Sequence, residues 1–115
     1  MAFEPVLPAD DLWQGEMRGV VVGGRRVLLL RTEEGVCAYE DRCAHLGLPL
    51  SQGRLEGGVI TCSAHHYQYD ARTGQGVNPD RVRLRAYPVC IVRGEIAVDV
   101  SAAERGPANG TEERR

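Results

Sequence analysis

Two apolar runs joined by a pair of glycines constrain the fold of this 115-residue chain more than any other feature of its sequence. The runs are MRGVVV (17–22) and RRVLLLR (25–31), and Gly23-Gly24 between them is typical of a tight β-hairpin. GVCAYE follows after the turn TEEG. RVRLRAYPVCIVRG alternates, and GEIAVDV is expected to pair back across Gly94. No segment keeps a long period of 3.6 residues, and one helical turn is expected at PADDLW. The pattern predicts an all-β domain built from antiparallel hairpins.

The middle of the chain, about 41–79, has a different texture. It is rich in Gly, His and Tyr and poor in long apolar runs. We expect it to form a small subdomain inserted between strands of the β base, with its own short strands at VIT and YQYD. From Ser101 onward the sequence loses all pattern. One domain is therefore expected over residues 1–100, followed by a disordered C-terminal tail over residues 101–115.

Composition excludes several classes of partner. The formal net charge is −2, which gives no electrostatic footprint for nucleic acid or for a membrane surface. No apolar run approaches the length of about 18 residues that a transmembrane helix needs. The start, MAFEPVLPADD, is acidic where a secretory signal is basic and apolar. These features predict a soluble cytoplasmic protein that binds neither nucleic acid nor membrane.

Two segments of the middle region each supply one cysteine and one histidine. The first is C-x-H, Cys43 and His45, and the second is C-x2-H, Cys62 and His65. In a reducing cytosol, cysteines beside histidines more often bind metal than form disulfides. Zinc accepts such a set tetrahedrally, but its usual motifs place C-x2-C or H-x3-5-H in one turn. A Rieske cluster instead places two cysteines on one iron and two histidines on the other. The spacing favours the 2Fe-2S cluster, with structural zinc as the alternative.

With these segments in view, nearly the whole chain except the tail resembles the Rieske-type ferredoxins. Gly47 after the first segment, the pair Tyr69-Asp70 after the second, and Pro79 in a third loop agree with that family. The resemblance implies the Rieske fold, an antiparallel β-sandwich base with a small inserted cluster-binding subdomain. It implies one Rieske-type 2Fe-2S cluster ligated by Cys43, His45, Cys62 and His65, with Gly47, Tyr67, Tyr69 and Pro79 around it.

Four positions bear on the reduction potential that the resemblance implies. Respiratory Rieske proteins tie their loops with two further cysteines, and those places hold Leu48 and Ala64 here. Tyr67 stands where that group has a serine that donates to a bridging sulfide, whereas Tyr69 matches a tyrosine that donates to a cysteine sulfur. Hydrogen bonds to cluster sulfurs raise the potential. The balance predicts a value near the low end of the Rieske range, about −150 mV.

Finer motifs are most similar to the ferredoxin components of four-component toluene and alkene monooxygenases. They are EGGVITC-x-AH, TG-x-G-x-NPD, the start MxFE, and DDLWxGEM. The resemblance implies a one-electron carrier, not an enzyme, which takes electrons from an NADH-dependent flavin and iron-sulfur reductase. It delivers them to the diiron hydroxylase of an aromatic or alkene monooxygenase, and a monomer suits such a shuttle. The alternatives are the ferredoxin of a Rieske ring-hydroxylating dioxygenase and the small subunit of an NADH-dependent nitrite reductase, because all three share the ligand spacing.

Charged residues near the cysteines have a structural and a functional interpretation. Arg81, Arg83 and Arg85 alternate, which predicts the solvated face of a strand or a basic stripe that guides an acidic partner. Glu40, Asp41 and Glu56 lie near the cluster segments in sequence and are either solvated or part of a reductase contact. His66 is expected to be exposed rather than a ligand, and Cys37 and Cys90 are expected to be buried thiols in strands.

Overall fold

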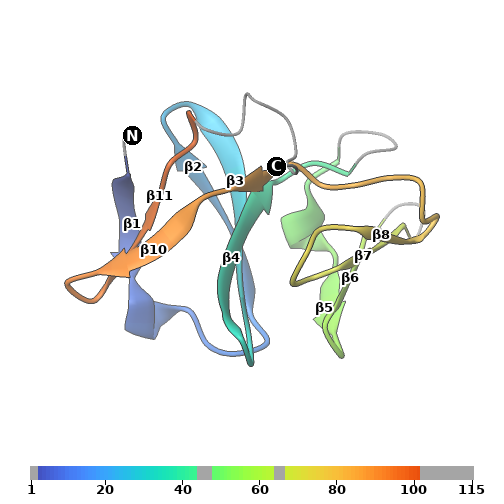
Figure 1. Ribbon diagram of the computed structural model, residues 1–115, viewed down its shortest axis with the longest axis horizontal. Coiled ribbons are helices and arrows are strands. Elements are labelled where there is room, and N and C mark those ends of the chain that lie inside the picture. Colours follow the sequence, from blue (N-terminus) through green and yellow to red (C-terminus); the bar gives the residue numbers. More distant parts are fainter. Residues whose placement is uncertain (1–2, 44–47, 64–66, 102–115) are drawn as a thin grey trace.

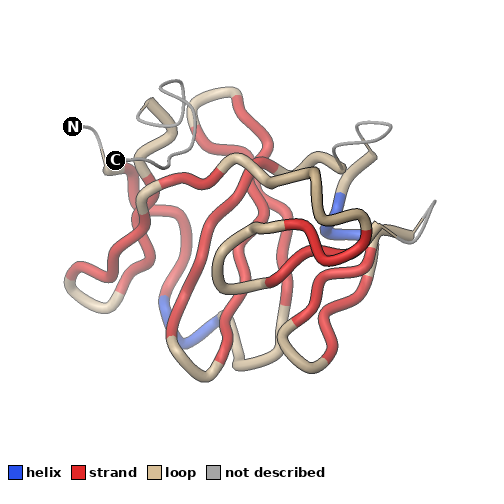
Figure 2. Tube along the Cα trace, turned by 45° about the vertical axis from the view of Figure 1, so that its right-hand side comes forward, coloured by secondary structure: helices blue, strands red, loops and turns tan. Residues whose placement is uncertain are grey.

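The protein is described by a computed structural model in which residues 3–43, 48–63 and 67–101 are placed (Figure 1). Within these residues it has eleven β-strands and two short 3₁₀ helices, arranged in three antiparallel sheets. The prediction of an all-β chain is confirmed. Figures 1 and 2 both show one sheet, here sheet B, in the middle of the molecule, with sheet A on one side and sheet C on the other. In the described part of the chain, no helix has the length and apolar character needed to cross a membrane.

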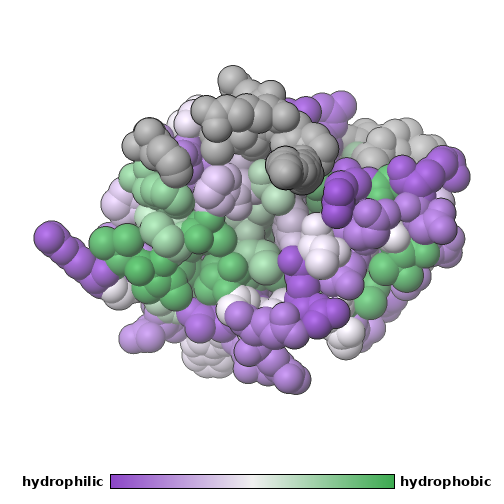
Figure 3. All heavy atoms as spheres, viewed as in Figure 1, coloured by the Kyte–Doolittle hydropathy of each residue, from purple (hydrophilic) through white to green (hydrophobic). Residues whose placement is uncertain are grey.

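Sheet A joins the two ends of the described chain. Its strand order is β1 (Glu4–Pro8), β11 (Glu95–Val98), β10 (Val89–Val92). The hairpin between β10 and β11 turns at Arg93 and Gly94, as the sequence predicts. The expected helical turn at PADDLW is the 3₁₀ helix η1 (Ala9–Asp11). Apolar side chains gather over β10 in Figure 3, where Ile91 and Val92 are about half exposed.

Sheet B contains the predicted glycine hairpin. Its order is β2 (Met17–Val22), β3 (Arg25–Thr32), β4 (Gly35–Glu40), β9 (Ala86–Tyr87). The register runs from Met17 opposite Leu30 to Val22 opposite Arg25, which leaves only Gly23 and Gly24 in the turn. Both have positive φ, 55° and 81°, as a two-residue hairpin turn of this kind requires.

Sheet C is formed entirely by the middle of the chain. Its order is β5 (Arg54–Glu56), β6 (Val59–Thr61), β7 (Gln68–Asp70), β8 (Gly76–Asn78). The short 3₁₀ helix η2 (Leu50–Gln52) precedes it. These strands lie inside the range 41–79, and β6 and β7 correspond to the expected strands VIT and YQYD.

The expectation of one alternating strand from residue 81 through 92 is wrong. Residues 81–85 form only an isolated bridge between Arg83 and Gln75, and strand structure begins at Ala86. Their backbone groups are used elsewhere, because Leu84 N–H donates to Gly74 O and Val82 O accepts from Gly76 N–H, both at 2.8 Å. Pro88 then separates β9 in sheet B from β10 in sheet A, since proline offers no N–H to a ladder.

Strand β3 is buried on both faces and separates two apolar cores. Val27 and Leu29 pack into a core between sheets A and B, whereas Leu28 and Leu30 pack into a second core that includes residues of sheet C. All four side chains are 0% exposed. Such a run of consecutive apolar residues is typical of a strand with no solvent-facing side.

Candidate metal centre

Two buried cysteines occupy equivalent places at the edge of the second core. Cys43 follows β4 and Cys62 follows β6 directly, and each is 1% exposed. Both pack with Tyr69 and Ile60 in the core between sheets B and C. No disulfide involves any of the chain's four cysteines, all of which lie in described segments.

The backbone closes both segments in the same way. Cys43 N–H donates to Leu48 O, and Cys62 N–H donates to Tyr67 O, each at 2.8 Å. Each cysteine therefore begins a loop that returns to it five residues later. His45 and His65 belong to these two loops by sequence, but they lie outside the described residues, as do Gly47, Ala64 and His66.

Tyr69 connects the core to one of the sulfurs. It sits opposite Ile60 in the β6–β7 ladder and is 0% exposed. Its hydroxyl oxygen lies 3.6 Å from the Cys43 Sγ, within hydrogen-bond range for sulfur. A phenol at this place stabilises negative charge on the Cys43 sulfur.

Tyr67 and Pro79 are both half-buried and take different places. Tyr67 packs against the second core and supplies the carbonyl that closes the Cys62 loop. Pro79 follows a cis peptide bond after Asn78. The backbone around it lies directly on Gly76, where a Cβ would collide with Pro79 O and would lie 2.6 Å from Val82 O.

Asp41, two residues before Cys43, is a buried carboxylate, which the sequence did not predict. It joins the two ends of the Cys43 loop through Ser51. Asp41 is 4% exposed, and its two oxygens accept from Ser51, one from the N–H at 2.8 Å and one from the hydroxyl at 2.7 Å. Gly19 of β2 faces this pair, because a Cβ there would lie 2.7 Å from Ser51 Oγ. The interpretation of Asp41 as part of a reductase contact is wrong, since its side chain is buried. Glu56 is exposed and Glu40 half-buried.

Sheet C is held against β4 by the buried Tyr39 and the half-buried Cys37. Cys37 and Cys90 lie in strands as expected, but both are half-buried rather than buried. The Tyr39 hydroxyl donates to Ala71 O at 2.8 Å, and the Cys37 thiol lies 3.9 Å from Arg72 O. Burial is the main cause that raises the pKa of both Tyr39 and Cys37 above their ordinary values, so both stay neutral at physiological pH. These contacts hold the turn after β7 against β4 of sheet B.

This arrangement fits a mixed cysteine and histidine iron site. The two sulfurs are shielded from water, a phenol lies beside one of them, and each loop carries one imidazole by sequence. Thiolate sulfur and imidazole nitrogen are the ligands of a Rieske 2Fe-2S cluster.

Comparison with known proteins gives a consistent result. Residues 2–88 match the Rieske [2Fe-2S] domain. The chain is 39% identical over 97 residues to the "Alkene monooxygenase system, ferredoxin component" of Xanthobacter autotrophicus, covering 84% of this chain and 80% of that protein. It is 32% identical over 93 residues to the "Naphthalene 1,2-dioxygenase system, ferredoxin component" of Pseudomonas putida, covering 80% and 89% of the two chains.

Solved structures resemble the whole described fold. The ferredoxin of carbazole 1,9a-dioxygenase from Nocardioides aromaticivorans IC177 superposes with a TM-score of 0.77 at 29% identity, over 85% of this chain and 97% of that chain. A chain in a complex of reduced oxygenase and oxidized ferredoxin in carbazole 1,9a-dioxygenase gives 0.76 at 33% identity, over 84% and 91%.

Proposed function

Since this chain belongs to the Rieske [2Fe-2S] domain family, we propose that it carries single electrons from an NADH-dependent reductase to a diiron hydroxylase. It has the Rieske fold and one Rieske 2Fe-2S cluster, and it is an electron-transfer component rather than a catalytic one, like the ferredoxin components that it resembles. The observation that carries the proposal is the pair of matched loops, each opened by a buried cysteine, within a chain 39% identical to an alkene monooxygenase ferredoxin component.

The four ligands follow from the two loops. Cys43 and Cys62 would hold one iron through their buried sulfurs, and His45 and His65 the other. When bound, the cluster supplies a site that accepts and releases one electron reversibly. The core around the sulfurs excludes water. With Cys43 as a thiolate ligand, the Tyr69 hydroxyl, 3.6 Å away, would be the donor to its sulfur.

Ligand charge and hydrogen bonding set the potential that this carrier needs. Two thiolates neutralise an oxidised core of charge +2, so the site takes up an electron more readily than one with four thiolates. Tyr69 adds a donor to one sulfur, but the place of the second donor is held by Tyr67, whose half-buried ring packs against the core. We expect a potential of about −150 mV, which suits a flavin-containing reductase as the electron source.

The first test is spectroscopic. Purified protein is expected to contain two irons and two sulfides per chain and, after reduction, to give the electron paramagnetic resonance signal of a cluster with histidine ligands. His45→Cys and His65→Cys are each expected to lower the potential sharply or to prevent cluster assembly. Cys90→Ala, a change of a half-buried thiol in sheet A, is the control and keeps the wild-type signal. Wild-type potential in either histidine variant would contradict the ligand set.

The second test concerns the partner. A tag on the N-terminal side of β1 leaves the loops accessible for capture of the oxygenase from the producing cells. A partner with two irons per catalytic subunit and no Rieske signal of its own supports the diiron hydroxylase. We also propose that the protein acts as a cytoplasmic monomer, which size-exclusion chromatography and cell fractionation test. The likeness to dioxygenase ferredoxins favours one alternative, the ferredoxin of a ring-hydroxylating dioxygenase. A partner that contains a Rieske cluster and a mononuclear iron would establish that alternative.

A further inference from the structure

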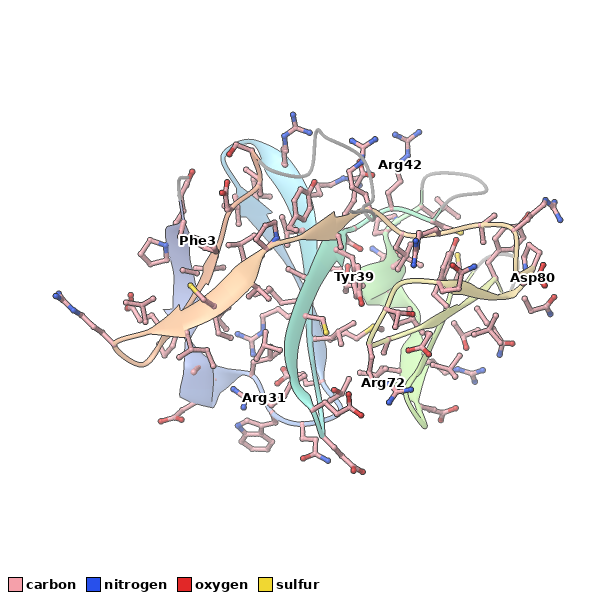
Figure 4. All side chains as sticks on the ribbon, in the orientation of Figure 1. Phe3, Arg31, Tyr39, Arg42, Arg72 and Asp80 are labelled. Atoms are coloured by element: carbon pink, nitrogen blue, oxygen red, sulfur yellow. The ribbon has the colours of Figure 1, made fainter. Side chains whose placement is uncertain are left out.

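Four arginines surround the point where sheet B leads into the Cys43 loop. Arg42 directly precedes Cys43, and Figure 4 shows it at the upper edge of the molecule. Backbone hydrogen bonds bring two more arginines to the same place, because Arg26 O accepts from Asp41 N–H at 3.1 Å and Arg85 O accepts from Glu40 N–H at 2.8 Å. Arg25, at the start of β3, completes the group. We call Arg25, Arg26, Arg42 and Arg85 the arginine rim.

The rim forms one side of a small hollow. This hollow has a volume of about 120 Å³ and is lined by Arg25, Arg26, Glu40, Asp41, Arg42 and Tyr87. A larger space of about 420 Å³ lies elsewhere, beside Glu34 and Arg72. Tyr87, Glu40 and Arg25 line the small hollow together. Burial, and then Glu40, raises the pKa of Tyr87, while Arg25 and Arg85 lower it.

Nearby acids do not neutralise three of the four rim arginines, Arg26, Arg42 and Arg85. Asp41 is buried and engaged by Ser51, and Glu40 is half-buried. Within the described residues no ion pair is formed by Arg26, Arg42 or Arg85, and all three are exposed. Positive charge at this edge is therefore available to a molecule that approaches from solvent.

The opposite end of the molecule is acidic. The helix η1, the β3–β4 turn and the end of β5 lie along the lower edge in Figure 1, and Arg31 and Arg72 lie toward that edge in Figure 4. Arg72 is paired there with Glu34, at 2.7 Å. The carboxylates on these segments are Asp10, Asp11, Glu33, Glu34 and Glu56. The net charge of −2 thus conceals a separation of charge along the molecule.

We propose that the arginine rim docks an acidic surface of the protein that exchanges electrons with this carrier. The inference rests on the proposed function and adds the chemistry of the contact. At about 0.1 M salt, charges beyond about 10 Å are largely screened, so an incoming protein is influenced by the rim more than by the distant carboxylates. A rim of one sign also orients the encounter and speeds it. Of the alternating arginines at 81, 83 and 85, Arg85 belongs to the rim through its backbone contact with Glu40, whereas Arg83 lies opposite Gln75.

Two small redox proteins of opposite charge test whether the charge at the arginine rim is positive to an approaching protein. Reduced wild-type protein is mixed in a stopped-flow instrument with plastocyanin, which is acidic, or with cytochrome c, which is basic, over a range of ionic strength. The rim predicts that the rate constant with plastocyanin falls as salt rises. The net charge of −2 taken alone predicts the opposite, with attraction to cytochrome c.

Charge reversals locate the effect. At about 0.1 M salt, Arg42→Glu is expected to lower the rate constant of electron transfer to plastocyanin roughly three- to tenfold. The double variant Arg26→Glu with Arg42→Glu is expected to lower it further. Arg93→Glu, in the β10–β11 turn of sheet A, makes the same change of net charge far from the loops and is expected to stay within about twofold of wild type. Potentials of all variants are measured so that rates are compared at equal driving force.

Each remaining outcome overturns a defined statement. Equal slowing in Arg42→Glu and Arg93→Glu, or a plastocyanin rate that rises with salt in the wild type, overturns the rim proposal while leaving the cluster in place. Tight binding of a single-stranded DNA oligonucleotide at the same salt, lost in Arg42→Glu, assigns the rim to nucleic acid and also overturns it. A preparation without a Rieske signal overturns the proposed function and the rim proposal together.

Discussion

Asp41 and Ser51 form a two-point contact in which both carboxylate oxygens accept from one residue, its N–H at 2.8 Å and its hydroxyl at 2.7 Å. The contact joins the end of β4 to η2 and spans the loop that Cys43 begins. A carboxylate is rarely buried unless it is paired, and here the Asp41 carboxylate is 4% exposed with both oxygens accepting hydrogen bonds. We therefore regard this pair as the clasp of the first cluster loop.

Removing the Ser51 hydroxyl is expected to loosen this loop. Ser51→Ala leaves a buried carboxylate oxygen short of a donor and should lower the free energy of unfolding by about 1–3 kcal/mol. It should also speed loss of the visible absorbance when the protein is incubated with an iron chelator. Ser101→Ala is a matched control, because the Ser101 hydroxyl donates to buried Asp99 at 2.6 Å at the other end of the chain. Equal chelation rates in the two variants would refute a special role for the clasp.

Gly19 tests the same clasp from the neighbouring strand. Gly19→Ala places a methyl group 2.7 Å from Ser51 Oγ and 2.9 Å from Asp41 Oδ2, so something must shift. We expect a loss of about 1–3 kcal/mol in the free energy of unfolding. The double variant with Ser51→Ala removes the closest clashing atom, and its cost should be smaller than the sum of the two single costs. Strict additivity in urea denaturation would show that the methyl group is accommodated elsewhere.

Removing the hydroxyl of Tyr69 or of Tyr39 distinguishes an effect on the reduction potential from an effect on stability. Tyr69→Phe removes the hydroxyl that lies 3.6 Å from Cys43 Sγ. A hydrogen bond of about 0.5–1.5 kcal/mol to the more negative, reduced form corresponds to a potential lowered by about 20–60 mV for one electron. Tyr39→Phe removes an equally buried hydroxyl that donates to Ala71 O instead. Voltammetry should find its potential close to that of the wild type, while its free energy of unfolding falls by about 1 kcal/mol. An unchanged potential in Tyr69→Phe would show that the Tyr69 hydroxyl does not act on the sulfur.

Stability is expected to fall at high pH. Burial raises the pKa of the Cys37 thiol above its ordinary value of 9.0 and that of Tyr39 above 10.0. Above about pH 9 the unfolded chain therefore loses protons that the folded chain keeps, and the free energy of unfolding declines as pH rises. Urea denaturation of wild type, Cys37→Ala and Tyr39→Phe at about pH 8 and about pH 10.5 checks this. The decline should be smaller in each variant, and an equal decline in all three would assign it to other groups.

Local sequence patterns predicted the hairpins but not the strands that depend on their partners. MRGVVV, RRVLLLR and the two glycines contain both the β-branched runs and the turn, so β2, β3 and their register follow directly. Strand β1 has two prolines in five residues, and it is a strand because Leu7 and Pro8 lie opposite Ile96 and Glu95 of β11. The three-residue strand β5 is likewise extended by pairing with β6 rather than by propensity.

The site shows the same division. The cysteine and histidine spacing is a local signal and predicted the ligand set, which stays a prediction because His45 and His65 lie outside the described residues. The clasp between Asp41 and Ser51, and the fit of Gly19 against it, join three separate segments of chain. No local sequence pattern predicts such a contact. From the sequence alone, an aspartate two positions before a cysteine is therefore interpreted as a surface charge, whereas the structure buries it.

The double-sided burial of β3 limits how the metal-binding part of this protein could be moved to another scaffold. Cys43, Cys62 and Tyr69 pack in a core whose other wall is Leu28 and Leu30 of β3, with Tyr39 of β4. A graft of residues 41–79 alone would leave that wall behind and expose apolar side chains on its inner surface. A transplantable unit needs at least this segment together with β3, β4 and the stretch that carries Leu84, because Leu84 belongs to the same core. An engineered redox module would therefore have to include Leu28, Leu30 and Tyr39 as well as the two loops.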